Sequence, residues 1–306
     1  MKQLPHPKSL TVGQKAAVIA PSSPVTSKHL IHFAISYLKT IGIVPVLGES
    51  CNMKNGYLSG SDDARAKDVN WAFSDENISA VFCLRGGYGV QRILDKVNFE
   101  VMRKNPKPLF GYSDITALHT AINQNAGFIT YHTPMLGTQN FMTANEYTLR
   151  CFHHFIFNPS PKSYQNPIEQ PWRFLNKGMG VGQLCGGNLS IIASSLGTPF
   201  EINTTGKILF IEEIGEEPYK IDRMLNHLRL AGKLDACAGM IFGSFTNCEP
   251  KEYEQSQTIP EIINDLGLDI PILYNFACGH TFPTASLPMG AMARLDSFAG
   301  TFEVLQ

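Results

Sequence analysis

The sequence carries almost no net charge, because 25 lysines and arginines stand against 26 aspartates and glutamates. Proteins that bind nucleic acid or an anionic membrane surface through a positive field need an excess of basic side chains. Long apolar runs are also missing, since the longest, at residues 16–20 and 238–242, are far shorter than the roughly 20 residues that cross a bilayer. We therefore expect neither a nucleic-acid partner nor a membrane partner.

The first ten residues contain prolines and polar side chains where a secretory signal needs an apolar stretch of roughly 7–15 residues. This favours a cytoplasmic protein. The cysteines are odd in number, widely spaced and without a C-x-x-C pair, which argues against a disulfide framework and against structural zinc. We expect them to be buried thiols and expect no metal and no cofactor; they are Cys51, Cys83, Cys151, Cys185, Cys237, Cys248 and Cys278.

A hydrophobic fraction of 43% and a charged fraction of 17% are typical of a globular protein, and 306 residues suit two domains. Short apolar runs alternate with helix-length amphipathic stretches in the first half, as in a parallel sheet built from βαβ units. This pattern predicts an α/β fold. The expected strands are 16–20, 44–47, 80–84, 108–111 and 127–132, and the expected helices are 28–41, a helix capped by Ser59 or Ser61 that ends near 73, 90–96 and 115–125.

Residues 157–176 contain four prolines and little periodicity, which is typical of a linker. We therefore expect domains at 1–156 and 177–306, joined by a linker at 157–176. The second domain opens on a glycine-rich segment, and its later part is rich in short strands and turns, which predicts a mixed fold. Its expected elements are a helix at 189–195, strands at 207–211 and 238–242, and a helix at 219–231.

A glycine-rich turn, Arg85-Gly86-Gly87-Tyr88-Gly89, follows the third expected strand. Consecutive glycines leave backbone amides uncovered, which suits binding of a phosphate or of an oxyanion, although a plain tight turn explains them equally well. A dinucleotide fingerprint would require a third glycine where Arg92 stands. The turn therefore gives little support to a nicotinamide cofactor.

A second turn, Gly111-Tyr112-Ser113-Asp114, follows the fourth expected strand and places a serine at a bend into a helix. The G-x-S-x-G pattern of a nucleophile elbow is broken by Ile115, so the residues alone leave Ser113 open as a nucleophile or as a helix N-cap. A nucleophilic serine needs a base and an acid. His280 lies among turn-forming residues, and Glu212 and Glu213 end an apolar strand, where capping or solvation is the alternative role.

Taken together, these motifs resemble the LD-carboxypeptidases, a family of serine peptidases. The resemblance is carried by motifs in both halves, namely residues 18–23, 84–89, 111–116, 186–189, 210–213, 218–224 and 279–280. It implies a flavodoxin-like N-terminal sheet domain with a smaller β-rich α/β C-terminal domain. It also implies a triad of Ser113 as nucleophile, Glu212 as acid and His280 as base.

The resemblance further implies an oxyanion hole of backbone amides, which we place on Asp114, Gly86 and Gly87. Arg85 and Arg223 are candidates for binding the free carboxylate of a peptide substrate. The implied reaction is hydrolysis of the L,D-peptide bond before the terminal D-alanine of cytosolic murein tetrapeptide in cell-wall recycling, by a homodimer. Glu213 stands where the family more often has aspartate, so which glutamate faces His280 is open.

Two other functions are compatible with the residues. Some members of the family cleave an aminoacyl-adenylate antibiotic and give self-immunity by stacking an aromatic side chain on the base. Trp172 is a candidate for that stacking, although a packing role explains it as well. The other alternative is a non-catalytic nucleotide-binding protein that uses the glycines at 86–89.

Overall fold

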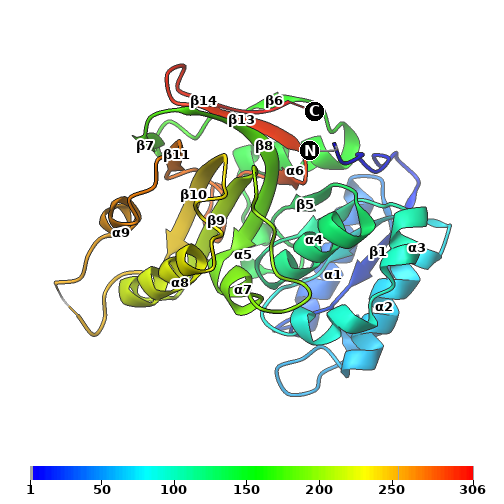
Figure 1. Ribbon diagram of the computed structural model, residues 1–306. Coiled ribbons are helices and arrows are strands. Elements are labelled where there is room, and N and C mark those ends of the chain that lie inside the picture. Colours follow the sequence, from blue (N-terminus) through cyan, green and yellow to red (C-terminus); the bar gives the residue numbers. More distant parts are fainter. Residues whose placement is uncertain (1–2, 254, 306) are drawn as a thin grey trace. The chain divides into compact units, whose positions relative to one another are not determined.

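The structure is a computed structural model that describes residues 3–253 and 255–305. It divides into two compact units. The first, which we call the amino-terminal unit, comprises residues 4–159 and 286–289, and the second, the carboxy-terminal unit, comprises Gln3 and residues 160–285 and 290–305, without residue 254. Residues 286–289 therefore belong to the amino-terminal unit, although more than 100 residues of the other unit separate them from the rest of it in the sequence. The chain is coloured from blue to red in Figure 1.

The amino-terminal unit contains a six-stranded sheet in the order β12-β5-β4-β3-β1-β2. Strands β1 to β5 pair with one another in parallel, and β12 pairs antiparallel with β5. This confirms the expected parallel sheet. The strands are β1 (Lys15–Ile19), β2 (Val44–Leu47), β3 (Ile78–Cys83), β4 (Leu109–Gly111), β5 (Thr130–His132) and β12 (Leu287–Met289).

Helices α1, α2 and α4 pack on the strands of this sheet. Ser61 caps α2, its Oγ accepting from the amide of Ala64 at 3.2 Å. The predicted helix at 90–96 is instead a 3₁₀ helix, and that at 115–125 is split into three short elements. The helical elements are α1 (Lys28–Thr40), η1 (Glu49–Asn52), α2 (Asp62–Ser74), η2 (Val90–Lys96), α3 (Phe99–Lys104), η3 (Ser113–Ile115), α4 (Thr116–Ala121), η4 (Ile122–Ala126), α5 (Gln139–Met142) and α6 (Glu146–Phe157).

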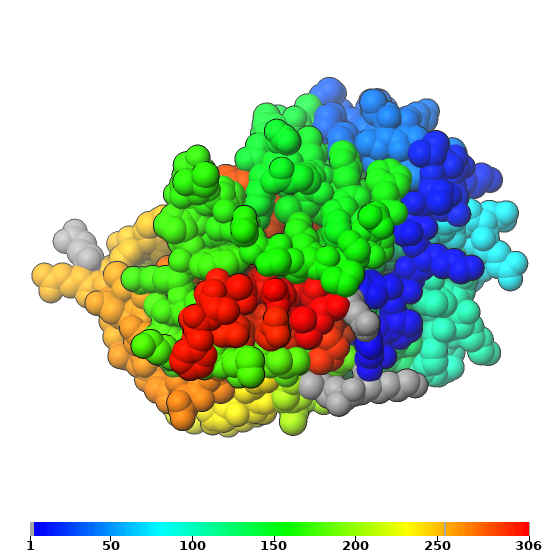
Figure 2. Space-filling view, turned by 90° about the horizontal axis from the view of Figure 1, so that it is seen from above, coloured from blue at the N-terminus to red at the C-terminus, as the bar shows by residue number. Residues whose placement is uncertain are grey.

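The carboxy-terminal unit contains an eight-stranded mixed sheet in the order β6-β14-β13-β8-β9-β10-β11-β7. Strands β8 to β11 are parallel, and antiparallel strands flank them on both sides. Strands β13 and β14, red in Figure 2, lie on the surface beside β6. The strands are β6 (Lys162–Ser163), β7 (Arg173–Asn176), β8 (Met179–Asn188), β9 (Ile208–Ile214), β10 (Gly239–Thr246), β11 (Ile272–Tyr274), β13 (Met292–Asp296) and β14 (Thr301–Val304).

One apolar cluster joins this sheet to three helices, α7 (Leu189–Ser194), α8 (Pro218–Leu230) and α9 (Ile259–Asp265). Each helix buries one apolar stripe, as expected for an amphipathic helix on a sheet. The cluster includes Leu209 and Phe242 from the strands and Leu225 from α8. The sequence analysis located α7 and α8 to within a residue or two, whereas the short helix α9 was missed among turn-forming residues.

Two expectations about this half of the chain need correction. The proposed linker at 157–176 includes β6 and β7, which are the two edge strands of the mixed sheet. Its prolines do not prevent this, because proline is tolerated at the edge of a sheet. The glycine-rich segment at 182–188 is the central strand β8. A Cβ on Gly186 would lie 2.0 Å from the carbonyl oxygen of Phe210, so close strand packing requires glycine there.

Candidate active site

The turn after β4 holds Ser113 in a conformation that few serines adopt. Its φ is 63°, in the left-handed region, which costs roughly 1–3 kcal/mol for a residue with a side chain. Such a bend at the end of a strand exposes a hydroxyl above the sheet, as in a nucleophile elbow. The N-cap of η3 is Tyr112, which makes no side-chain capping bond. The structure therefore favours the elbow over the N-cap role for Ser113.

The glycine turn after β3 lies directly against Ser113. A Cβ built on Gly86 would stand 3.0 Å from the Cβ of Ser113 and 3.2 Å from its Oγ. A Cβ on Gly87, whose φ is 112°, would meet the Oγ of Ser23 at 2.4 Å. Within residues 3–253 and 255–305, the amides of Gly86, Gly87 and Asp114 donate no hydrogen bond. These three amides are thus uncommitted donors close to a strained serine.

Beneath the elbow, His119 of α4 is fully buried and its ring nitrogen Nε2 lies 2.9 Å from the carbonyl oxygen of Gly111. Burial lowers the pKa of His119 to about 4, although the bond to Gly111 opposes the shift. The ring is therefore neutral at pH 7, and its Nε2–H donates to the last residue of β4. This bond supports the strand end from which the elbow departs.

The depressed pKa predicts a loss of stability in acid. The unfolded histidine titrates near 6.5, so it takes up a proton before the folded one does as the pH falls from about 6.5 to 4. Glutamine does not titrate, so His119→Gln should lack this acid-dependent loss of stability. We therefore expect the difference in free energy of unfolding between wild type and variant to fall by about 3 kcal/mol, in the variant's favour, between pH 7 and 4. Urea unfolding of both proteins at each pH measures this. A pH-independent difference would contradict the prediction.

In the carboxy-terminal unit, His280 and Glu212 form a hydrogen-bonded ion pair. The Nδ1 of His280 lies 2.6 Å from the Oε2 of Glu212, and Glu212 is completely buried. Burial alone lowers the pKa of His280, but the charge and hydrogen bond of Glu212, assisted by the charge of Glu213, raise it overall. A carboxylate on Nδ1 fixes the ring and leaves Nε2 as the basic nitrogen, which is the arrangement of a catalytic base and its orienting acid.

The two adjacent glutamates have different partners, which answers the question left open by the sequence. Successive residues of a strand point to opposite faces, and Glu213 points away from His280. Its carboxylate accepts from Asn188, from the amide of Ile214, and from the amide and hydroxyl of Ser190 at the start of α7. Neither glutamate ends the strand and neither is solvated, since both are buried inside β9.

Glycine is also required beside the histidine. A Cβ on Gly279, whose φ is 129°, would stand 2.4 Å from the Oγ of Ser244 and 2.8 Å from the Oε2 of Glu212. Gly279 therefore allows the His280 loop to approach the buried carboxylate closely. A cavity of about 370 Å³ adjoins this loop and is lined by polar and aromatic residues, among them Ser244, Asn275 and Thr281.

The two arginines proposed to bind a carboxylate, and the tryptophan proposed to stack on a base, lie in different surroundings. Arg85 is half-buried, and its Nη1 donates to the carbonyl of Pro24 at 2.7 Å, which leaves other guanidinium donors for a ligand. Arg223 is exposed on α8. Trp172 is half-buried, with its ring 6.1 Å from that of Phe276, which fits the packing role.

All seven cysteines are buried, and burial raises the thiol pKa of Cys51 and Cys185 to about 12. Thiols of this kind are poor nucleophiles at neutral pH. Within the described ranges, no group of three or more His, Cys, Asp and Glu side chains is placed to hold a metal ion. No helix of the described chain is long and apolar enough to cross a membrane.

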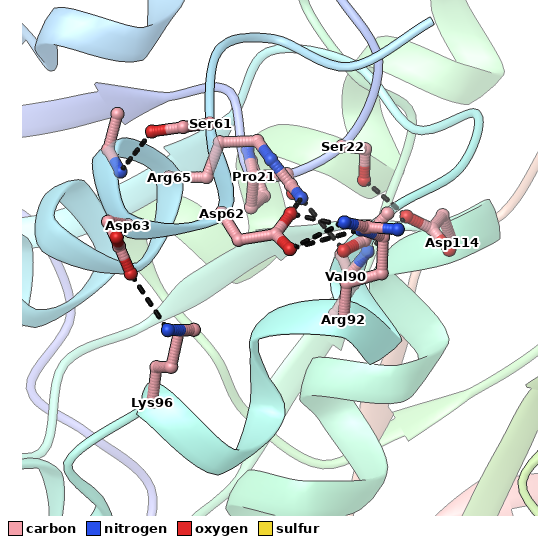
Figure 3. Close-up of polar contacts among 12 residues, drawn as sticks. Pro21, Ser22, Ser61, Asp62, Asp63, Arg65, Val90, Arg92, Lys96 and Asp114 are labelled. Atoms are coloured by element: carbon pink, nitrogen blue, oxygen red, sulfur yellow. Dashed lines mark hydrogen bonds and ion pairs between the residues drawn. The ribbon is translucent and has the colours of Figure 1, made fainter.

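The network of polar contacts around Asp114 was missed by sequence reasoning. In it, Ser22 of the loop after β1 donates to Asp114 of η3, and Arg65 of α2 donates to the carbonyl of Pro21 in the same loop (Figure 3). The only signal in the sequence was a charged residue, Arg65, inside an otherwise ordinary helix pattern. A charge on a helix is usually solvated, so this signal is weak.

Comparison with known proteins matches both halves of the chain to one family. The model of the LD-carboxypeptidase N-terminal domain matches residues 16–133, and that of the C-terminal domain matches residues 181–295. A protein of Bacillus subtilis (strain 168), called a probable murein peptide carboxypeptidase, is 41% identical over 293 residues, which cover 95% of this chain and 91% of that protein.

Two solved structures share the fold. A muramoyltetrapeptide carboxypeptidase from Oxalobacter formigenes is 27% identical with a TM-score of 0.82, covering 96% of this chain and 99% of that one. An MccF-like protein from Bacillus anthracis strain Ames is 27% identical with a TM-score of 0.88, covering 98% and 99%. With both domain models matched in order and 41% identity over nearly the whole length, the chain belongs to the LD-carboxypeptidase family.

Proposed function

We propose that this chain is a serine carboxypeptidase that hydrolyses the L,D-peptide bond before the terminal D-alanine of murein tetrapeptides. The observation that carries the proposal is the buried pair of Glu212 and His280, which is a base with its orienting acid in a chain that also presents a strained serine. The substrate class follows from the relative named as a probable murein peptide carboxypeptidase.

In the proposed mechanism, Ser113 attacks the carbonyl carbon of the scissile bond while His280 takes its proton at Nε2. Glu212 holds the ring through Nδ1 and stabilises the imidazolium that forms, in keeping with the raised pKa of His280. His280 then gives the proton to the leaving amine, and D-alanine departs. Water attacks the acyl-enzyme in the second half of the reaction and regenerates Ser113.

The uncommitted amides of Gly86, Gly87 and Asp114 are the proposed oxyanion hole. Backbone donors act well in this role because they are fixed before the charge develops. Recognition of the terminal carboxylate is assigned to Arg85, which lies on the same turn, and to Arg223. A guanidinium binds a carboxylate with two parallel hydrogen bonds and so reads both its charge and its shape.

The proposal is tested by mass spectrometry of D-alanine release from a purified L-Ala-D-Glu-diamino acid-D-Ala tetrapeptide. We expect release at a rate typical of enzymes, on the order of 1–10³ per second. The matched control is the same peptide with a terminal L-alanine, which should remain intact. Absence of release from the tetrapeptide by folded protein, together with cleavage of an aminoacyl-adenylate amide, would move the function to the self-immunity branch of the family.

That second function rests on the likeness to the MccF-like protein, and the packed position of Trp172 gives it no added support. A cytoplasmic location, expected from the composition of the first ten residues, and a homodimer, expected from the resemblance, remain predictions. Gel filtration coupled to light scattering measures whether the protein is a dimer.

A further inference from the structure

Three loops of the amino-terminal unit meet at the carboxyl ends of adjacent strands. They follow β1, β3 and β4, which are neighbours in the sheet. The first contains Ser22 and Ser23, the second is the glycine turn, and the third carries Ser113 and Asp114. The proposed oxyanion hole takes amides from the second and third loops, so its geometry depends on what fixes these loops to each other.

The carboxylate of Asp114 is the direct link between them. Its Oδ2 accepts from the hydroxyl of Ser22 at 2.6 Å and from the amide of Val90 at 2.9 Å (Figure 3). Val90 follows the glycine turn immediately. One oxygen of one side chain therefore ties the loop after β1 and the loop after β3 to the residue beside the nucleophile.

Asp114 occupies an unfavourable place for a carboxylate. The residue is 1% exposed, and its second oxygen, Oδ1, has no hydrogen bond within the described residues. Burial raises its pKa to about 6, although the bonds from Ser22 and Val90 and the charge of Arg65 oppose the shift. Burying a half-satisfied charge destabilises a fold, so stability alone gives little reason for an acid at this position.

A second set of contacts fixes the same turn from the other side. The buried guanidinium of Arg65 donates to the carbonyl of Gly89 at 2.8 Å and also to the carbonyl of Pro21, while Asp62 binds its other end. In addition, the Oγ of Ser23 accepts from the amide of Tyr88 at 3.1 Å. With these anchors in place, the bond from Val90 to Asp114 sets where the turn lies relative to Ser113.

We propose that the side chain of Asp114 is a positioning residue, which holds the Gly86-Gly87 amides at the correct place beside Ser113 by accepting hydrogen bonds from Ser22 and Val90. The inference rests on the proposed function in one respect, namely that Ser113 is the nucleophile. A misplacement of about 1 Å near the reacting atoms costs up to 10²-fold in rate. Since oxyanion binding acts on the transition state, the loss should fall on kcat and not on KM.

The test compares Asp114→Asn with Asp68→Asn, a matched control in the same unit. Asp68 is also buried, and it accepts from the amide of Ser50 at 2.8 Å and the amide of Glu49 at 3.1 Å, at the start of η1. We expect Asp114→Asn to lower kcat on tetrapeptide by roughly 10- to 100-fold with KM within about twofold of wild type. Asp68→Asn should change the midpoint of urea unfolding but neither kinetic constant.

A second readout is independent of the natural substrate. A fluorophosphonate probe modifies an activated serine with loss of fluoride, and its phosphoryl oxygen then occupies the oxyanion hole. We expect Ser113 to react roughly 10- to 100-fold more slowly in Asp114→Asn than in wild type, as measured by mass spectrometry of the labelled peptide. Ser22→Ala removes the hydroxyl that donates to Asp114 and keeps the carboxylate, so it should slow the labelling of Ser113 several-fold. This variant tests the same contact if Asp114→Asn does not fold.

The outcomes separate this inference from the proposed function. Rapid labelling of Ser113 in wild type and equally rapid labelling in Asp114→Asn and Ser22→Ala would overturn the positioning role while leaving Ser113 as the nucleophile. Equal slowing by Asp68→Asn would also overturn it, because the effect would then be one of general stability. Absence of Ser113 labelling in folded wild type would overturn both.

Discussion

Replacement of Ser113 by alanine is expected to lower kcat for D-alanine release by roughly 10⁵- to 10⁶-fold, the loss seen when the nucleophile of a serine hydrolase is removed. The physical reason is that no other group within the proposed site forms the acyl-enzyme. Release of D-alanine from tetrapeptide by wild type and variant, at equal protein concentration, measures the effect.

A matched variant separates chemistry from folding at this position. Because Ser113 has a φ of 63°, glycine relieves the backbone strain that alanine keeps, so Ser113→Gly should be more stable than Ser113→Ala by roughly 1 kcal/mol. Both variants should be inactive. Substantial activity in either one, with residual wild-type enzyme excluded by mass spectrometry, would contradict the assignment of the nucleophile.

Replacement of Glu212 by glutamine should lower kcat by roughly 10⁴-fold, because an amide neither fixes the same tautomer of His280 nor stabilises its imidazolium. The adjacent Glu213→Gln is the control. Glu213 binds Asn188 and Ser190, so its replacement should lower the free energy of unfolding and leave kcat within about tenfold of wild type.

The pair of variants tests which carboxylate serves the histidine. Steady-state kinetics on tetrapeptide and urea unfolding are measured for both. If Glu213→Gln lost as much activity as Glu212→Gln while remaining folded, the acid of the triad would be wrongly assigned. If Glu212→Gln kept wild-type kcat, the pair formed with His280 would have no catalytic role.

Much of the fold could be predicted because its signals are local. The parallel sheet followed from apolar runs that alternate with amphipathic stretches, and α1, α2, α7 and α8 lie where the sequence predicted helices. Strand β8 was not predicted, because glycine has a low strand propensity. At Gly186 that propensity is outweighed by the close approach of the neighbouring strand β9, which only the tertiary structure shows.

The pairing of Glu212 with His280 was expected only from the family resemblance, and the pairing of Ser22 with Asp114 was not predicted. Glu212 and His280 are 68 residues apart, and Ser22 and Asp114 are 92 apart, so no periodicity connects them. The sequence also placed Glu212 and Glu213 at the end of a strand. The strand in fact continues to Ile214, because partners inside the fold replace water for both carboxylates.

By itself, the sequence determined the α/β class, the strand-to-helix turn at Ser113 and the glycine turn at Gly86. These depend on backbone preferences and on residues close in the chain. Only the tertiary structure decided that Glu212 and not Glu213 binds His280, and that the carboxylate of Asp114 joins three loops. Side-chain hydrogen bonds are short and directional, so their partners are fixed by the folded arrangement and not by the order of residues.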